Sequence, residues 1–174
     1  MGVLVEDMLT LARLDETHDN EIVPVDLASV ARDAARDAEV SAPDREFTVQ
    51  ADGSEMVSGD GHQIHQVIAN LLRNAVIHTP AGTPVEITVA RSGDEVRMDV
   101  RDHGHGLPDG VGDKLFERFW RSERGRERGK AGSGLGLAIV AEIVEAHGGR
   151  VHAKNADDGK GAVFSVWLPL ASRS

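Results

Sequence analysis

The sequence predicts an α/β two-layer sandwich, in which helices pack on one face of a mixed, largely antiparallel sheet. Two patterns support this prediction. Apolar residues recur at helical spacing in four segments, and short segments that alternate apolar and polar residues lie between them, some in pairs joined by turn residues. The 174 residues divide into a helix with a linker over 1–20 and one domain over 21–174.

The N-terminal part of the chain predicts two helices. An apolar face runs through residues 3–16 without a capping residue before it, so this segment is interpreted as the end of a longer helix. Polar residues 17–21 follow and mark a boundary. Asp26 is the expected N-cap of a second helix over 27–40.

The middle of the chain predicts two strands and a third helix. Residues 45–51 and 55–58 are expected to be strands. Asp60 is expected to cap the third helix, with Gln63 in the position of a capping box. This helix is expected to run to about His78.

The C-terminal half predicts two hairpins and a fourth helix. The strands of the hairpins are expected at 83–91 with 95–102 and at 150–156 with 162–169. The first hairpin turns across Ser92-Gly93-Asp94. The helix begins at Leu135 and ends before Gly148, which suits the C′ position.

Composition excludes several classes of protein. Hydrophobic residues make up 40% and charged residues 28%, as in soluble globular domains. The formal net charge of -10 argues against a protein that coats nucleic acid, and the absence of cysteine excludes disulfides and thiolate metal sites. No apolar run reaches the roughly 20 residues of a membrane span and no signal peptide opens the chain, so we expect a cytoplasmic protein that makes no membrane contact.

A row of polar residues spaced by four runs along the third helix. The row consists of Gln66, Asn70, Asn74 and His78. Asparagine is a poor helix former, and a solvated helix face more often carries Glu, Lys and Arg. Neutral amides suit the oxygen shell of Mg²⁺ beside phosphate. The row alone supports this site and an ordinary solvated face about equally.

Asp102 ends a predicted strand, with Gly104 and Gly106 just beyond it. A carboxylate there can accept a hydrogen bond inside a pocket, and the glycines allow a flat ligand to lie against the backbone. An ordinary Asp-Gly turn is the alternative. His103 and His105 suggest a metal, but their flanks offer no further ligand cluster, so the turn interpretation is favoured for them.

A basic segment follows over residues 117–131. It contains six Arg and Lys residues and three Glu residues, which gives a local charge of +3 in an acidic chain. Positive charge beside glycines indicates a polyphosphate ligand, and Arg121 and Lys130 are the first candidates for phosphate contact. A solubilising loop is the alternative. With few apolar residues, this segment is expected to be the most mobile internal part of the chain without nucleotide and to order around it.

Glycines crowd the start of the fourth helix, at positions 129, 132, 134 and 136. Their spacing is not the G-x-G-x-x-G of a dinucleotide-binding strand and turn. It is not a P-loop either, because Gly129-Lys130 is followed by Ala131. Both motifs share backbone N–H groups at a helix N-terminus, which bind anions. We therefore expect these glycines to hold the phosphates of a nucleotide under the basic segment, as under a lid.

Together these motifs resemble a known family. The chain is similar to the catalytic ATP-binding domain of sensor histidine kinases, which has the Bergerat fold shared with gyrase B subunits and mismatch-repair ATPases. The matching motifs are QVIANLLRNAVIHT (the N box), DHGHGLP (the first glycine box), FERFW (the F box) and GSGLGLAIV (the second glycine box). The resemblance covers about residues 22–170. The opening helix resembles the end of the second helix of the dimerisation and phosphotransfer bundle.

The resemblance implies roles for single residues. Asn70 would ligate Mg²⁺ and Asn74 would support the phosphates. Asp102 would accept the adenine amino group, with Gly104 and Gly106 beside the base. The implied catalytic residues are Gln66, Asn70 and Arg121. The implied nucleotide-binding residues are Asn70, Asn74, His78, Asp102, Gly104, Gly106, Arg121, Lys130, Gly132, Ser133, Gly134, Leu135 and Gly136. Phe116 and Phe119 would anchor the lid to the core.

The chain departs from the family in two places. Ile77 and His78 stand where the family often has lysine and tyrosine, which removes one phosphate contact and implies a modest nucleotide affinity. None of the eight histidines lies in the phosphoacceptor motif; His18-Asp19 begins like it but continues NEIV. The resemblance therefore implies a chain that binds Mg-ATP but lacks the phosphoacceptor histidine.

The leading hypothesis is the ATP-binding half of a histidine kinase of a two-component system. A related ATPase or serine kinase, such as an anti-sigma-factor kinase, is the second, and a non-enzymatic interaction module that kept the fold is the third. The intact glycine boxes argue against the third. The first hypothesis implies the phosphoacceptor histidine helix of the parent kinase and a response regulator receiver domain as partners. It also implies a homodimeric parent anchored in the cell membrane.

Overall fold

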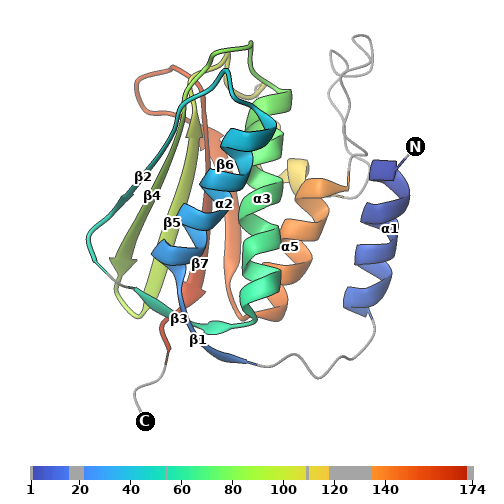
Figure 1. Cartoon of the computed structure of the whole chain (residues 1–174), viewed down its shortest axis with the longest axis vertical. Helices are drawn as coiled ribbons and strands as arrows, with labels where there is room; N and C mark the ends of the chain where they lie inside the picture. Colours follow the sequence, from blue (N-terminus) through green and yellow to red (C-terminus); the bar gives the residue numbers. More distant parts are fainter. Residues whose placement is uncertain (1, 16–21, 54, 109, 118–134, 172–174) are drawn as a thin grey trace.

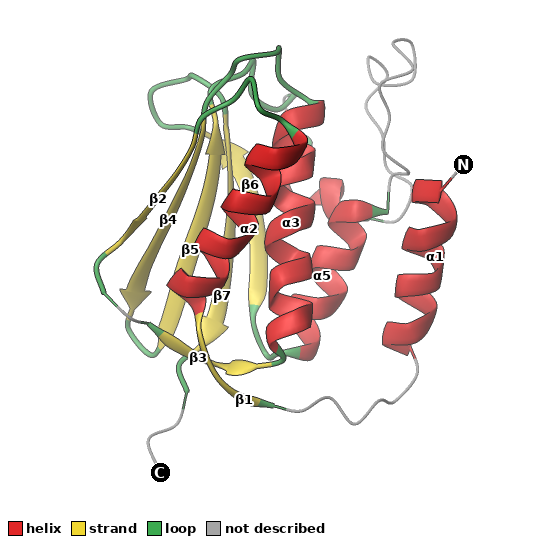
Figure 2. Ribbon diagram, viewed as in Figure 1, coloured by secondary structure: helices red, strands yellow, loops and turns green. Residues whose placement is uncertain are grey.

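In the computed structural model, three helices form one layer over a five-stranded sheet (Figure 1). These helices are α2 (Leu27–Ser41), α3 (Gly61–Ile77) and α5 (Gly136–Ala146). A further helix, α1 (Gly2–Asp15), packs beside α5. The structure describes residues 2–15, 22–53, 55–108, 110–117 and 135–171. The predicted two-layer sandwich, with helices on one face of the sheet, is confirmed (Figure 2).

The sheet has the strand order β2-β4-β5-β7-β6. Its strands are β2 (Phe47–Ala51), β4 (Val85–Ser92), β5 (Glu95–Asp102), β7 (Ala162–Pro169) and β6 (Arg150–Asn155). Only β2 and β4 run parallel, and the other three pairs are antiparallel, so the sheet is mixed and largely antiparallel as predicted. Both predicted hairpins are confirmed, and the β6–β7 hairpin places β6 at the edge beside the loop that follows β5.

Two short elements were not predicted from the sequence. Strand β1 (Val23–Asp26) pairs antiparallel with β3 (Met56–Gly59) in a separate two-stranded sheet. It spans four residues and includes Pro24, so it carries neither a clear alternation nor a full set of backbone donors. A single 3₁₀ turn, η1 (Gly112–Phe116), lies between β5 and the basic segment. It packs against both α5 and β6.

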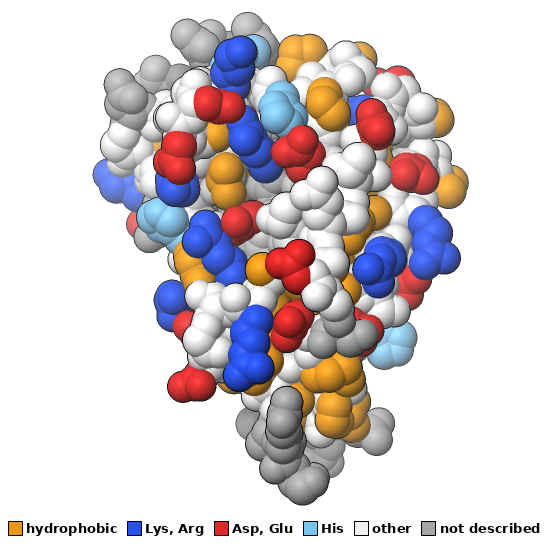
Figure 3. Space-filling view, turned by 90° about the vertical axis from the view of Figure 1, so that its left-hand side faces the viewer, with side chains coloured by type: hydrophobic (Ala, Val, Ile, Leu, Met, Phe, Trp, Pro, Cys, Tyr) orange, Lys and Arg blue, Asp and Glu red, His pale blue; other side chains and the backbone are white. Residues whose placement is uncertain are grey.

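The core lies between the helices and the inner face of the sheet. The predicted apolar stripe of α3 is confirmed, because Ile64, Ile68 and Leu71 are buried. On the opposite face of the sheet, charged side chains of both signs are interspersed (Figure 3). There the guanidinium groups of Arg97 and Arg150 lie over the ring of Trp167, at 5.1 and 4.4 Å from its centroid.

Both predicted helix caps are confirmed. The Asp26 carboxylate accepts a hydrogen bond from the backbone N–H of Ser29, and Asp60 accepts from those of His62 and Gln63. The capping box expected at Gln63 is not reciprocal, however. The backbone N–H of Asp60 donates instead to Nε2 of His147, 3.1 Å away at the end of α5. A residue from another helix thus completes the cap of α3.

A buried arginine holds the other end of α3. The guanidinium group of Arg45 donates to the backbone carbonyls of Val76 and Thr79, at 2.9 and 3.0 Å. It also donates to the hydroxyl of Thr79. A cation suits a helix C-terminus, where the last carbonyls lack partners within the helix and the dipole is negative. Arg45 therefore fixes the end of α3 that carries Asn74 and His78.

Candidate functional site

The polar row of α3 faces the start of α5. Nε2 of Gln66 donates to Oδ1 of Asn70 at 2.8 Å, and Nδ2 of Asn70 donates to the backbone carbonyl of Gly136 at 3.1 Å. Asn70 is buried, so the solvated-face interpretation does not hold at this position. The side chain of Asn74, one turn further along, makes no hydrogen bond to another residue within the described ranges, and its amide is available to a ligand.

The N-terminus of α5 lies against an ion pair that reaches α1. Leu135 is the N-cap residue and is buried, and Gly136 opens the helix. A Cβ on Gly136 would lie 3.2 Å from a guanidinium nitrogen of Arg73. That guanidinium group lies 3.5 Å from the buried carboxylate of Asp7 on α1. Glycine at 136 thus leaves room for the Arg73 guanidinium group beside the first residue of α5.

Asp102 ends β5 as a buried carboxylate. Its Oδ1 accepts hydrogen bonds from the backbone N–H groups of Gly104 and Ala162, at 3.0 and 3.2 Å. Its Oδ2 accepts none from the residues that the structure describes. Two backbone donors hold the carboxylate in one orientation and leave its second oxygen as an acceptor for a ligand.

The glycines around Asp102 make room mainly for protein groups. A Cβ on Gly104 would lie 2.7 Å from Cγ2 of Thr79, and a Cβ on Gly161 would lie 2.0 Å from the Asp102 carbonyl oxygen. A Cβ on Gly106 would lie 2.5 Å from Oδ1 of Asn155. Both Gly106 and Gly161 also have positive φ angles, of 83° and 87°. Close packing of the chain on itself therefore requires glycine here, a reason that differs from the expected approach of a flat ligand.

His78 is the C-cap residue of α3, and its backbone N–H donates to the carbonyl of Asn74. Although the residue as a whole is exposed, desolvation by the protein around its ring lowers the pKa of His78 below its ordinary value of 6.5. The negative charge of Asp102 opposes this shift and raises the pKa in part. The imidazole is thus neutral at neutral pH and lies within electrostatic range of the Asp102 carboxylate.

Several predicted site residues lie outside the described residues. They are Arg121, Lys130, Gly132, Ser133 and Gly134, together with Phe119 of the F box. The other aromatic residue expected to anchor the lid, Phe116, packs edge-on against Phe164 of β7. The ring centroids are 6.4 Å apart and the rings are inclined at 83°. The start of the F box therefore contacts the core, and the lid itself stays a prediction.

The donor groups at this site fit a magnesium ion shared with phosphate. Within the described ranges, no group of three or more His, Cys, Asp or Glu side chains could hold a metal ion by itself. Mg²⁺ in nucleotide sites usually takes only one or two protein oxygens and binds the rest of its shell through phosphates and water. The Oδ1 of Asn70 accepts one hydrogen bond and keeps a second lone pair for a cation.

Comparison with known proteins identifies the family. The family model described as "Histidine kinase-, DNA gyrase B-, and HSP90-like ATPase" matches residues 59–172. The chain belongs to this ATPase family. The match spans α3, the Asp102 loop and the β6–β7 hairpin, so it includes the amide row, Asp102 and the start of α5.

Sensor histidine kinases are prominent among the relatives of this ATPase-family chain. It is 40% identical over 168 residues to the probable sensor histidine kinase TcrY of Mycobacterium tuberculosis, covering 96% of this chain and 35% of that protein. It is 43% identical over 110 residues to the signal transduction histidine-protein kinase AfsQ2 of Streptomyces coelicolor, covering 63% and 20%. The chain thus spans about a third or less of these two relatives.

Solved structures show the same ATPase fold. The mycobacterial sensor histidine kinase MprB superposes with a TM-score of 0.75 at 29% identity, covering 87% of this chain and 99% of that one. Full-length ShkA in complex with AMPPNP superposes with a TM-score of 0.80 at 28% identity, covering 98% of this chain and 36% of that one.

In the parts of the chain that the structure describes, every helix is too short or too polar to cross a membrane.

Proposed function

We propose that this chain binds Mg-ATP and supplies its γ-phosphoryl group to a histidine of a two-component signalling kinase. The observation that carries this proposal is a pair of unlike polar groups, one at the end of a sheet strand and the other on the helix layer. A fixed carboxylate with one uncommitted oxygen lies at the end of β5, and a row of amides runs along α3 toward the N-terminus of α5. These groups match the base and the phosphates of one nucleotide.

Asp102 is proposed to bind the base. Its Oδ2 would accept the exocyclic amino group of adenine, while Gly104 and Ala162 hold Oδ1. Guanine presents a carbonyl oxygen in place of that amino group, and a carboxylate repels it. This contact therefore selects adenine over guanine nucleotides.

Asn70 and Asn74 are proposed to serve the phosphates. When bound, Mg²⁺ would neutralise charge on the phosphate oxygens. Asn70 would hold the ion through Oδ1, and Gln66 would keep the amide in that orientation. Asn74 would donate to a phosphate oxygen. The N–H groups at the start of α5 and the basic residues Arg121 and Lys130 would stabilise the remaining negative charge.

The acceptor histidine is proposed to come from another segment or chain. In the transfer, an imidazole nitrogen forms a bond to the γ-phosphorus while the bond to the β,γ-bridging oxygen breaks, which leaves ADP. His147 cannot serve as the acceptor, because its ring nitrogens are engaged by the Ile143 carbonyl and the Asp60 N–H, at 2.7 and 3.1 Å. His78 lies on the same helix as the amide row and cannot swing in line with the phosphate.

The partners proposed for the whole kinase follow from the sensor histidine kinases among its relatives. They are the phosphoacceptor helix of the parent kinase, in which α1 would be the end of a bundle helix, and the receiver domain of a response regulator. A homodimeric parent anchored in the cell membrane, with this part in the cytoplasm, belongs to the same proposal.

Incubation with γ-labelled ATP tests the proposed reaction. The chain is incubated with Mg²⁺ either alone or with a separately purified helical bundle that carries the acceptor histidine of a relative. We expect an acid-labile, base-stable label on the bundle and none on the chain alone. An acid-stable label on the added bundle would indicate a serine kinase instead, and a label on the chain alone would show that the acceptor has been misplaced.

A further inference from the structure

We infer that Asn155 is a positioning residue for the base half of the nucleotide site. It acts by tying down the loop that carries Gly104 and Gly106, and the inference rests on the proposed role of Asp102 in binding adenine. Asn155 is the last residue of β6, far in sequence from this loop, and lies outside the four motifs by which the chain resembles its family.

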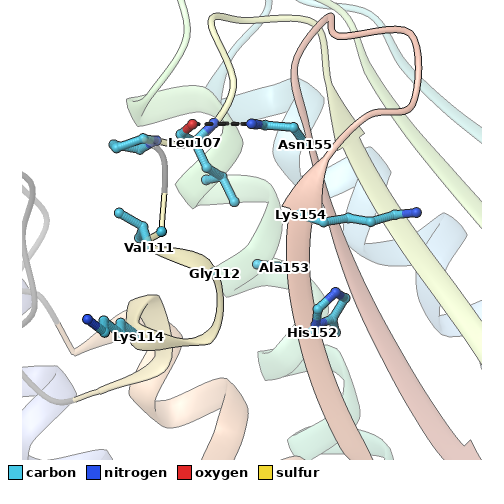
Figure 4. A pocket seen from close by; sticks show the side chains of 10 residues that line it. Leu107, Val111, Gly112, Lys114, His152, Ala153, Lys154 and Asn155 are labelled. Atoms are coloured by element: carbon cyan, nitrogen blue, oxygen red, sulfur yellow. Dashed lines mark hydrogen bonds between the residues drawn. The ribbon is translucent and has the colours of Figure 1, made fainter.

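The contact is a two-point clamp on one backbone residue. Oδ1 of Asn155 accepts a hydrogen bond from the backbone N–H of Leu107 at 2.6 Å, and Nδ2 donates to the Leu107 carbonyl at 3.3 Å (Figure 4). The primary amide of Asn carries one acceptor and two donor hydrogens, so it can pair with the N–H and the C=O of one backbone residue as a neighbouring strand does. The two residues are 48 positions apart, so the clamp holds the loop to the sheet edge.

The absence of a side chain at Gly106 makes room for this clamp. Its φ of 83° is unfavourable for a residue with a side chain, and a Cβ there would lie 2.5 Å from Oδ1 of Asn155. The glycine next to Leu107 therefore leaves space that the Asn155 amide occupies. This contact gives a reason for a glycine at 106 even before any ligand is bound.

The same hairpin holds the other end of the loop. Ala162 is the register partner of Asn155 across β6 and β7, and its N–H donates to Oδ1 of Asp102. The loop from Asp102 to Leu107 is thus tied at both ends to one cross-strand pair. The position of the Asp102 carboxylate relative to Gly104 and Gly106 depends on both ties.

This loop borders an open pocket. An open, solvent-facing pocket of about 590 Å³ lies between the loop and β6, bordered by Leu107, Val111 and Gly112 on one side and by Ala153 on the other (Figure 4). A segment next to a pocket has fewer van der Waals contacts on that side. The two hydrogen bonds of Asn155 therefore contribute more to holding the loop in place than they would in a fully packed core.

The test compares ligands with and without a base. Affinities for ATP, ADP and inorganic tripolyphosphate, each with Mg²⁺, are measured by calorimetry or by competition for Asn155→Ala and Asn155→Asp. We expect Asn155→Ala to weaken the binding of ATP and ADP by about tenfold, as the loss of two hydrogen bonds implies. The affinity for tripolyphosphate should not change. Asn155→Asp keeps the 2.6 Å acceptor contact but sets a carboxylate oxygen against the Leu107 carbonyl, so it should also weaken the binding of both nucleotides.

Two further variants make each outcome decisive. Lys154→Ala, on the same strand and exposed, should bind all three ligands like the wild type. Asp102→Asn tests the base site itself. The positioning role is wrong, and the base site stands, if Asp102→Asn weakens ATP binding while Asn155→Ala does not. The same conclusion follows if Asp102→Asn weakens ATP binding but Asn155→Ala weakens the binding of ATP and tripolyphosphate equally. If Asp102→Asn leaves ATP affinity unchanged, the base site and the clamp's role both fall. Thermal unfolding of each variant shows that it is folded when measured.

Discussion

The side chain of Asn70 donates a hydrogen bond to the backbone carbonyl of Gly136, 3.1 Å away, and so joins the middle of α3 to the first residue of α5. The residue proposed to ligate Mg²⁺ is therefore also part of the contact between two helices. Changes at Asn70 should affect both stability and metal-dependent binding, and the two effects can be separated.

We predict that Asn70→Ala lowers the free energy of unfolding by about 1–3 kcal/mol, because buried polar partners lose their hydrogen bonds. It should also reduce ATP affinity in Mg²⁺ by roughly tenfold and affect binding in EDTA less. Chemical denaturation and calorimetry measure the two quantities. The control is His65→Ala, which changes another residue of α3 and removes a surface contact with Asp37 of α2. Equal losses of affinity with and without Mg²⁺ would make Asn70 structural only.

We predict that Asp102→Asn weakens ATP and ADP by similar factors. In asparagine an NH2 group replaces one carboxylate oxygen, and the other oxygen loses its charge. Either the backbone donors or the adenine amino group therefore faces a donor in place of an acceptor. A hydrogen bond to a charged group contributes roughly 1.5–3 kcal/mol, which corresponds to about 10- to 150-fold in affinity. Calorimetry with both nucleotides, and with GTP as a comparison, checks this. Unchanged affinity for ATP and ADP would refute the assignment of the base.

We predict that Gly161→Ala is far more destabilising than Gly159→Ala, although the two glycines lie only two positions apart in one turn. Both glycines have positive φ, of 87° and 76°, so both variants bear a strain of about 1–2 kcal/mol. A Cβ on Gly159 meets nothing within 4 Å, whereas one on Gly161 would lie 2.0 Å from the Asp102 carbonyl oxygen. Gly161→Ala should therefore cost more than about 4 kcal/mol or prevent folding. Similar denaturation midpoints for the two variants would contradict this reading of the turn.

We predict that His78 makes the protein less stable as the pH falls. The pKa of His78 is lowered in the folded state, mainly by desolvation, so the unfolded chain binds the proton first as the pH drops through 6.5. The wild type should therefore lose more unfolding free energy between pH 7.5 and pH 5.5 than His78→Gln does. Every other ionisable group is the same in both proteins, so its contribution cancels in the difference. Parallel pH profiles would show that His78 does not contribute.

The local features of this fold could be predicted from the sequence. Asp26 and Asp60 are recognisable caps, and the period of the apolar residues identifies the helices and both hairpins. The amide row and Asp102 were recognisable because residue type, spacing and position on an element agree. What the local pattern could not supply was the parallel pairing of β2 with β4, because a parallel pair leaves no signal in the turn between its strands.

The contacts missed at the site join residues that are distant along the chain. Asn155 meets Leu107 across 48 residues, Ala162 meets Asp102 across 60, and His147 meets Asp60 across 87. Each depends on where the β6–β7 hairpin or the end of α5 lies in the folded molecule. A histidine at a helix end and an asparagine at a strand end are common, and nothing in their own neighbourhood marks these two.

The position of Trp167 beneath Arg97 and Arg150 on the outer sheet face has an optical consequence. The chain has two tryptophans and no tyrosine, so its near-ultraviolet emission comes from Trp167 and Trp120. Trp167 lies on the outer sheet face, away from the helix layer, and Trp120 belongs to the segment predicted to be the lid. The variant Trp167→Phe would therefore carry a single natural fluorophore in that segment, and its emission would follow nucleotide binding there without any added dye.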